Sequence, residues 1–183
     1  MKKYYTSSVI LAVVAVLGFT ACSDLKDKIF QSFTTSATSV DFTINIVTST
    51  TAQTEIGTLI QHVNIDSIIK AETGDAFSLD DISSINVEEV KITIKNPDVD
   101  NNFANFEDGS LLFHTNTDPT PVQVASGVNP DVFATEWLMP VDNSINLKNH
   151  LKGTEIGYVL KGKARRVTTK PLDCVMAIKF KIN

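Results

Sequence analysis

The stretch LDCVMAIKFKI at residues 172–182 decides the fold class. Apolar side chains occupy every second position from Cys174 to Ile182, while Lys179 and Lys181 fall on the opposite face. This period of two is typical of a β-strand with one face buried. Lysine on the outer face also discourages pairing between the edges of two molecules.

The same alternation recurs along the chain. Residues 40–47 place Val40, Phe42, Ile44 and Ile46 on one face, and the polar residues 48–51 then predict a loop. Between residues 85 and 94 the phase of alternation changes, which predicts a β-bulge near Glu88–Glu89. Further strands are predicted at residues 110–115, 122–125, 133–139 and 156–164.

Two short helices interrupt the strands. Asn64 can cap a helix over residues 64–72, and Gly74 suits its left-handed end. A second helix is predicted over residues 145–152, ending at Gly153. Many short strands with few helices predict a mainly β fold, an antiparallel immunoglobulin-like β-sandwich, as a single domain over residues 39–183.

Three segments resemble the late-embryogenesis-abundant (water-stress) β-sandwich family. They are VKITIKNP at 90–97, VASG at 124–127 and YVLKG at 158–162. The resemblance covers about the second half of the chain and implies the same sandwich architecture. It implies no ligand.

The amino terminus is typical of a secretory signal peptide over residues 1–21. Met1 and two lysines precede an apolar run at residues 9–19, and the small residues Thr20 and Ala21 follow it. The alternative is a transmembrane helix, which needs about 20 apolar residues. The run is shorter than that, so we favour export and cleavage.

Residues 19–22, Phe-Thr-Ala-Cys, resemble the lipobox of bacterial lipoproteins, of the kind found in Bacteroidota. Phe19 departs from the aliphatic residue usual at that place. The resemblance implies that Cys22 receives a diacylglycerol, becomes the first residue after cleavage, and begins a tether over residues 22–38. The alternative is an ordinary cysteine after a standard cleavage site.

Two acyl chains are enough for stable anchoring, so the membrane is the expected partner of Cys22. Ser23 stands where an aspartate would indicate retention at the inner membrane. We therefore expect a lipid-anchored protein of the bacterial cell envelope, at the outer membrane. The sequence does not indicate whether the protein faces the periplasm or the cell surface.

The charge of the chain disfavours nucleic acid as a partner. The 183 residues carry 16 basic and 21 acidic side chains, and phosphate contacts require the opposite balance. A local basic cluster, formed by Lys161, Lys163, Arg165 and Arg166, is interpreted as a solvated strand end and turn.

No motif indicates catalysis or a cofactor. The three histidines, His62, His114 and His150, lack the spacing of metal ligands, and Cys174 lies on an apolar strand face. No serine-hydrolase elbow, phosphate-binding loop or dinucleotide fingerprint is present. We therefore predict a protein that is not an enzyme and needs no cofactor.

One oxygen-rich loop is a weak candidate for a calcium site. Its possible ligands are Asp98, Asp100 and Asn102, but Phe103 stands where an EF-hand needs glycine. A plain loop between strands is the favoured interpretation. Four aromatic residues are candidates for stacking on sugars, with core packing as the favoured alternative: Phe103, Phe106, Trp137 and Tyr158.

These observations predict a non-enzymatic envelope lipoprotein with a binding, adhesion or scaffolding role. Its partner would be another envelope protein or a glycan. The alternative is a carbohydrate- or calcium-dependent ligand-binding module of a nutrient-uptake system. The residues that bind the ligand are not indicated by the sequence.

Overall fold

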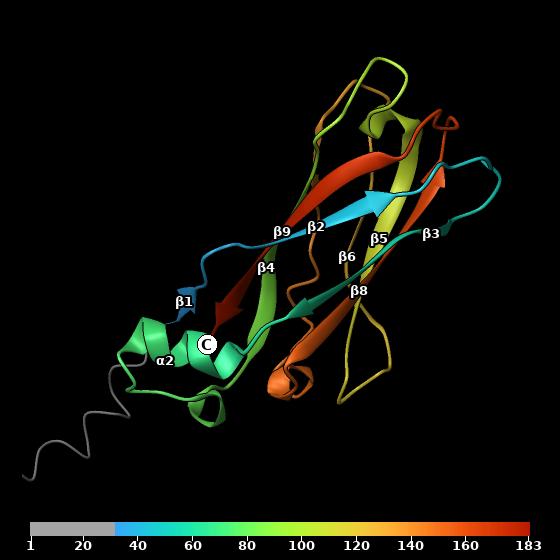
Figure 1. Cartoon of the computed structure of the whole chain (residues 1–183). Helices are drawn as coiled ribbons and strands as arrows, with labels where there is room; N and C mark the ends of the chain where they lie inside the picture. Colours follow the sequence, from blue (N-terminus) through green and yellow to red (C-terminus); the bar gives the residue numbers. More distant parts are fainter. Residues whose placement is uncertain (1–31) are drawn as a thin grey trace, which may run out of the picture. The chain divides into compact units, whose positions relative to one another are not determined.

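The computed structural model describes residues 32–183 (Figure 1). The predicted signal peptide, Cys22 and residues 22–31 of the predicted tether lie outside this range. The rest of the tether contributes strand β1 (Phe33–Thr34) and the start of strand β2 (Thr38–Ile44). Among the described residues, no helix is long and apolar enough to cross a membrane.

Strands dominate the described part of the chain and form two antiparallel sheets. Besides β1 and β2, the first sheet contains β4 (Ile85–Ile94), β7 (Glu136–Met139) and β9 (Leu172–Ile182). Its strand order is β1-β9-β4-β7, and β2 pairs with the same edge of β9 as β1 does. The second sheet has the order β3-β8-β5-β6, made of β3 (Thr54–His62), β5 (Phe106–Thr115), β6 (Val122–Val128) and β8 (Glu155–Ala164).

The pairing of these strands is nested. The chain pairs β2 with β9, β3 with β8, β4 with β7 and β5 with β6, so that it resembles one long hairpin folded over on itself. Two further pairings, β4 with β9 and β5 with β8, connect these strand pairs into the two sheets. Eight strands connected in this way form a jelly roll.

The predicted β-sandwich of two antiparallel sheets is therefore confirmed, but the immunoglobulin-like strand order is not found. Immunoglobulin sheets pair several strands that are adjacent in the sequence. Here β5 and β6 are the one consecutive pair that is hydrogen-bonded within a sheet of the described chain. Most other connections instead cross from one sheet to the other.

Strand β9 has the bounds that its alternation predicts, and its apolar face lies in the core. The predicted bulge in β4 is also confirmed, because the register with β9 shifts between Val87 and Glu89. Strand β3 was missed. A register shift between Glu55 and Gly57 breaks its alternation, so Ile56 and Gly57 are both buried.

The first predicted helix is confirmed as α2 (Ile65–Thr73), although the second prediction is wrong. The Asn64 side chain accepts a hydrogen bond from the Ser67 amide at 3.0 Å, and Gly74 is left-handed with a φ of 58°. Where the second helix was expected, only the 3-10 helix η4 (His150–Lys152) forms. The Leu147 amide instead donates to the carbonyl of Ile85 at 2.7 Å, so this backbone joins β4.

Two further 3-10 helices, η2 (Leu79–Asp81) and η3 (Phe103–Asn105), complete the fold. Apolar side chains from both sheets fill the space between them, and the four aromatic candidates all lie in this core. The rings of Phe103 and Trp137 meet edge to face at 5.7 Å, as do those of Phe113 and Tyr158 at 5.6 Å. Core packing is therefore the correct interpretation of these residues.

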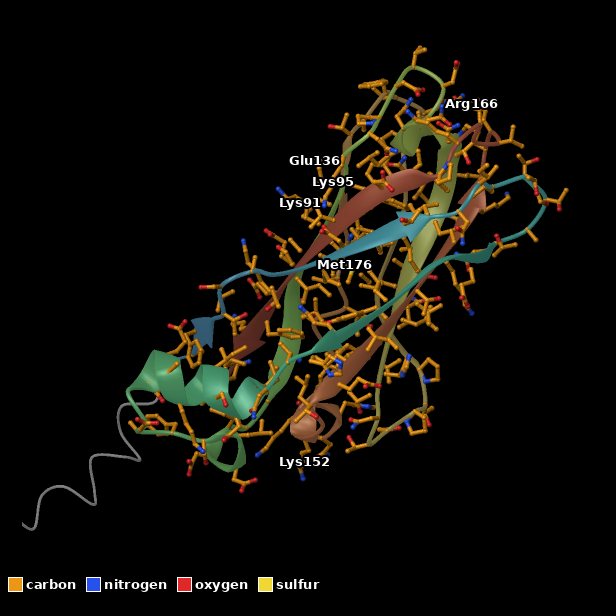
Figure 2. All side chains as sticks on the ribbon, viewed as in Figure 1. Lys91, Lys95, Glu136, Lys152, Arg166 and Met176 are labelled. Carbon is orange, nitrogen blue, oxygen red and sulfur yellow. The ribbon has the colours of Figure 1, made fainter. Side chains whose placement is uncertain are left out.

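The strand directions gather the connections at two ends. Four loops lie together at one end, which we call the loop end: residues 45–53, 95–105, 129–135 and 165–171. The opposite end holds α2, η4 and the start of the described chain, because β1 pairs with the last residues of β9 (Figure 1). Figure 2 shows Arg166 at the loop end and Lys152 at the opposite end.

Candidate functional site at the loop end

Buried polar side chains concentrate at the loop end. Asparagine is seldom fully buried, because each unpaired polar atom in a protein interior costs free energy. Four asparagines are nevertheless buried in the loops at this end, and we call them the asparagine cluster: Asn101, Asn102, Asn105 and Asn129. Their side chains must therefore find partners inside the protein.

Asn105 joins two of the loops. Its side-chain oxygen accepts from the Asn102 amide at 3.1 Å, and its side-chain nitrogen donates to the carbonyls of Asp100 and Val167 at 2.9 and 3.0 Å. Its own carbonyl accepts from the backbone amides of Arg165 and Arg166 at 2.7 and 3.1 Å. One buried residue thus fixes the position of the 165–171 loop against the 95–105 loop.

The other members extend this network. Asn101 accepts from the Thr169 amide at 2.8 Å, and Asn129 donates to the carbonyls of Phe103 and Phe106. Thr168 connects the 45–53 loop in the same way, because its hydroxyl accepts from the Val47 amide at 2.9 Å. All four loops are therefore connected by hydrogen bonds to other loops or to the strands beside them.

Two arginines of the predicted basic cluster have structural roles that the sequence did not indicate. Arg165 donates to the carbonyls of Ala104, Phe106 and Asn129, at 2.9, 3.2 and 2.9 Å. Arg166 pairs with Asp131, and this pairing lowers the pKa of the aspartate. The cluster does lie at a strand end and turn, but these two side chains hold loops together.

Two of the three candidate calcium ligands, Asp98 and Asn102, have side-chain partners within the protein. Asp98 pairs with Lys170 at 2.6 Å and accepts from the Asn101 side chain at 2.8 Å and the Asp100 amide at 3.0 Å. Asn102 uses its side-chain oxygen to accept from the Ala104 amide at 2.9 Å. Within residues 32–183, no group of three or more histidine, cysteine, aspartate or glutamate side chains is arranged to hold a metal ion.

Large apolar side chains protrude from the loops that this network holds. Val99 is 81% exposed, and Phe133 is 57% exposed on the 129–135 loop. Val132, next to Phe133, and Val167, on the 165–171 loop, are exposed as well. We call these four residues the apolar rim. Several large apolar side chains exposed at one end of a domain are typical of a surface that binds a partner.

Two grooves lie along the strands, and the second of them reaches Gln53 at the edge of the loop end. One, of about 290 Å³, lies beside strand β7 and is lined by Glu88, Glu89 and residues 138–141. The other, of about 460 Å³, lies along β5 and β6. We call the second one the β5–β6 groove.

The remaining candidates for chemistry are dispersed. Cys174 is buried, and its burial raises the pKa of the thiol to about 12, so it is not a reactive nucleophile. His150, the first residue of η4, has its buried Nδ1 atom 3.2 Å from the carboxylate of Asp118 in the β5–β6 connection, with no hydrogen bond formed. Neither groove is lined by a histidine or a cysteine.

The network predicts a large effect of Asn105→Ala. The substitution leaves the Asn102 amide and two carbonyls without their partners, so we expect the free energy of unfolding to fall by about 2 kcal/mol or more. Denaturant unfolding measures this change. Asn149→Ala is the matched control, because Asn149 is exposed and makes no capping hydrogen bond, and it should stay near wild type. Equal stability of the two variants would contradict a structural role of the cluster.

The Asp98 ion pair predicts a pH dependence. Lys170 and the Asn101 amide lower the pKa of the Asp98 carboxyl from 3.8 to about 2. Because the pKa is lowered by folding, this group stabilises the fold above its ordinary pKa, and the contribution is lost as the pH falls through about 2. The stability difference between wild type and Asp98→Asn should therefore shrink from pH 4 to pH 2. Asp100→Asn, which removes no ion pair within the described chain, should show no such trend.

Comparisons with known proteins do not place the chain in a family. No protein-family model matches it, and no curated protein matches it. Among solved structures, it is similar to that of the infectious bursal disease virus Gx strain, with 10% identity, a TM-score of 0.28, and coverage of 83% of this chain. The chain spans 41% of that structure's length. A second similar structure, the virus-like particle of the extra small virus of the giant freshwater prawn Macrobrachium rosenbergii, has 12% identity, a TM-score of 0.19, and coverage of 85% of this chain and 81% of that one. At these TM-scores we draw no conclusion from either.

Proposed function

We propose that this chain is a lipid-anchored, non-enzymatic protein of the bacterial cell envelope that binds another envelope protein through its loop end. The observation that carries the proposal is the apolar rim, exposed on loops that a buried polar network holds in place. The role is one of binding, adhesion or scaffolding. Attachment rests on the lipobox-like residues around Cys22.

The internal pairing of charges supports a protein as the partner. Asp98 pairs with Lys170 and Asp131 with Arg166, so these four charges beside the rim already have partners. The groups left for binding are apolar side chains surrounded by polar ones. Protein interfaces have this composition, with an apolar centre and a polar periphery.

The fixed conformation of the loops supports tight binding. A loop that must become ordered on binding loses conformational entropy, which weakens the complex. The hydrogen bonds of Asn105, Arg165 and Thr168 already order these loops in the free protein. Less entropy is therefore lost when the apolar rim meets its partner.

The place where the described chain begins also supports the proposal. Strand β1 pairs with the last two residues of β9, whereas the 165–171 loop precedes the first residue of β9. Eleven residues of extended strand separate the two ends, which is roughly 35 Å. The described chain therefore begins at the end of the sandwich opposite the loop end.

Anchoring predicts that Cys22 carries the lipid. Cells grown with a labelled fatty acid should incorporate the label into the wild-type protein and not into Cys22→Ala, because the thiol is the acylated atom. Cys174→Ala is the matched control and should keep the label. An unlabelled wild-type protein would overturn the anchor. Protease treatment of intact cells then distinguishes the surface face of the outer membrane from the periplasmic face.

The proposed binding surface predicts a site-specific contact. A photo-crosslinking phenylalanine analogue at position 133 should give one discrete adduct in intact cells, because Phe133 is 57% exposed on the apolar rim. The same analogue at Ile60, which is 59% exposed on β3, is the matched control and should not give it. Val132→Asp should abolish the adduct. The same adduct from both positions, or one formed only between two copies of this chain, would contradict the proposal.

The alternative, a carbohydrate- or calcium-dependent module, receives no support from the residues first considered for it. The four aromatic candidates are buried, and Asp98 already pairs with Lys170. A different surface, the β5–β6 groove, is lined mostly by polar side chains.

A further inference from the structure

The β5–β6 groove forms where small residues face one another across two strands. The register places Gly109 opposite Gly127 and Ser110 opposite Ser126. Packing explains the glycines, because a Cβ atom on Gly109 would lie 2.6 Å from the Trp137 ring and one on Gly127 would lie 2.7 Å from Pro140. The glycines therefore do not by themselves indicate a ligand.

Ser110 adds a polar group that a ligand can reach. Its side chain lines the groove, although the residue as a whole is only 5% exposed. Its hydroxyl group makes no hydrogen bond to another described residue, and the oxygen is accessible from the groove. An accessible hydroxyl that lines a groove and has no partner among the described residues is available to a bound molecule.

The walls of the groove add further polar groups. Gln53 donates to one carboxylate oxygen of Asp108 at 3.1 Å, and no hydrogen bond to the other oxygen is present within the described chain. On the opposite side, Gln123 donates to the Ser126 hydroxyl at 3.3 Å. One carboxylate, two carboxamides and two hydroxyls therefore surround a space of about 460 Å³.

We propose that the β5–β6 groove binds a neutral saccharide through its hydroxyl groups. Neighbouring hydroxyls of a sugar can donate to the Asp108 carboxylate, and the serine and glutamine side chains offer both donors and acceptors. Val128 is the one large apolar residue in the lining. This site is separate from the apolar rim and does not depend on the protein partner proposed above.

The lining disfavours other classes of ligand. No lysine or arginine lines the groove itself, and an anionic group such as phosphate would face the Asp108 carboxylate there. An apolar molecule would leave the Ser110 hydroxyl unpaired. Calcium needs six to eight oxygen ligands and usually several carboxylates, and Asp108 is the one carboxylate in the lining.

The test uses the full chain, labelled with nitrogen-15 and purified in detergent. Neutral oligosaccharides of glucose, mannose and xylose are titrated to millimolar concentration, with glucose 1-phosphate as an anionic comparison. We expect one of the neutral sugars to shift the amide resonances of Gly109 and Gly127, which lie in the groove. The shifts should persist in EDTA, because the protein groups contact the sugar directly.

Two variants separate binding from folding. Ser110→Ala should weaken the affinity roughly 3- to 10-fold, as expected for one neutral hydrogen bond, while the unfolding midpoint stays unchanged or rises. Asp108→Asn should weaken it roughly 10- to 100-fold, because the lost acceptor is charged. Asp80→Asn, an exposed change at the opposite end, is the matched control and should bind like wild type.

Three outcomes would overturn the proposal. The first is that no neutral sugar shifts either glycine, and the second is that the shifts appear only when calcium is added. The third is that Ser110→Ala destabilises the fold and leaves the affinity of the sugar intact.

Discussion

The hydrogen bonds of Asn105 are the constraint on which the loop end depends. In a jelly roll the strands pair one another, but the four connections gathered at one end have no regular partners for their backbone groups. A carboxamide side chain both donates and accepts, so a buried asparagine can pair with such groups on two loops at once. Asn105 does this for Asn102, Asp100 and Val167.

This constraint explains how the loops keep their conformation although several of their apolar side chains remain exposed to solvent. The loops are held from within by Asn105, Asn129 and Arg165, and the exposed Arg166–Asp131 pair joins two of them at the surface. Val99 and Phe133 are therefore not needed for packing, and they remain exposed. An exposed apolar group that is not needed for stability indicates a surface available to a partner.

Alternation alone could predict the sheets, because burial on one face imposes a period of two. It identified β9 and the bulge in β4 correctly. It missed β3, where the shift at Gly57 breaks the period. The wrong prediction of a helix at residues 145–152 came instead from helix signals such as Gly153, and there the Leu147 amide donates to β4. Strand order and the loop contacts join residues far apart in the sequence, such as Arg165 with Asn129, so no local pattern contains them.

The asparagine cluster and the β5–β6 groove use polar side chains in two different ways. Sheet packing requires glycine at 109 and 127, since a side chain there would meet Trp137 or Pro140. Ser110 lines the groove with a hydroxyl that is accessible and has no partner among the described residues. The asparagine cluster is buried, and its polar groups are paired. Polar groups that are paired within the protein hold this fold together, whereas accessible polar groups without protein partners are the ones available to a ligand.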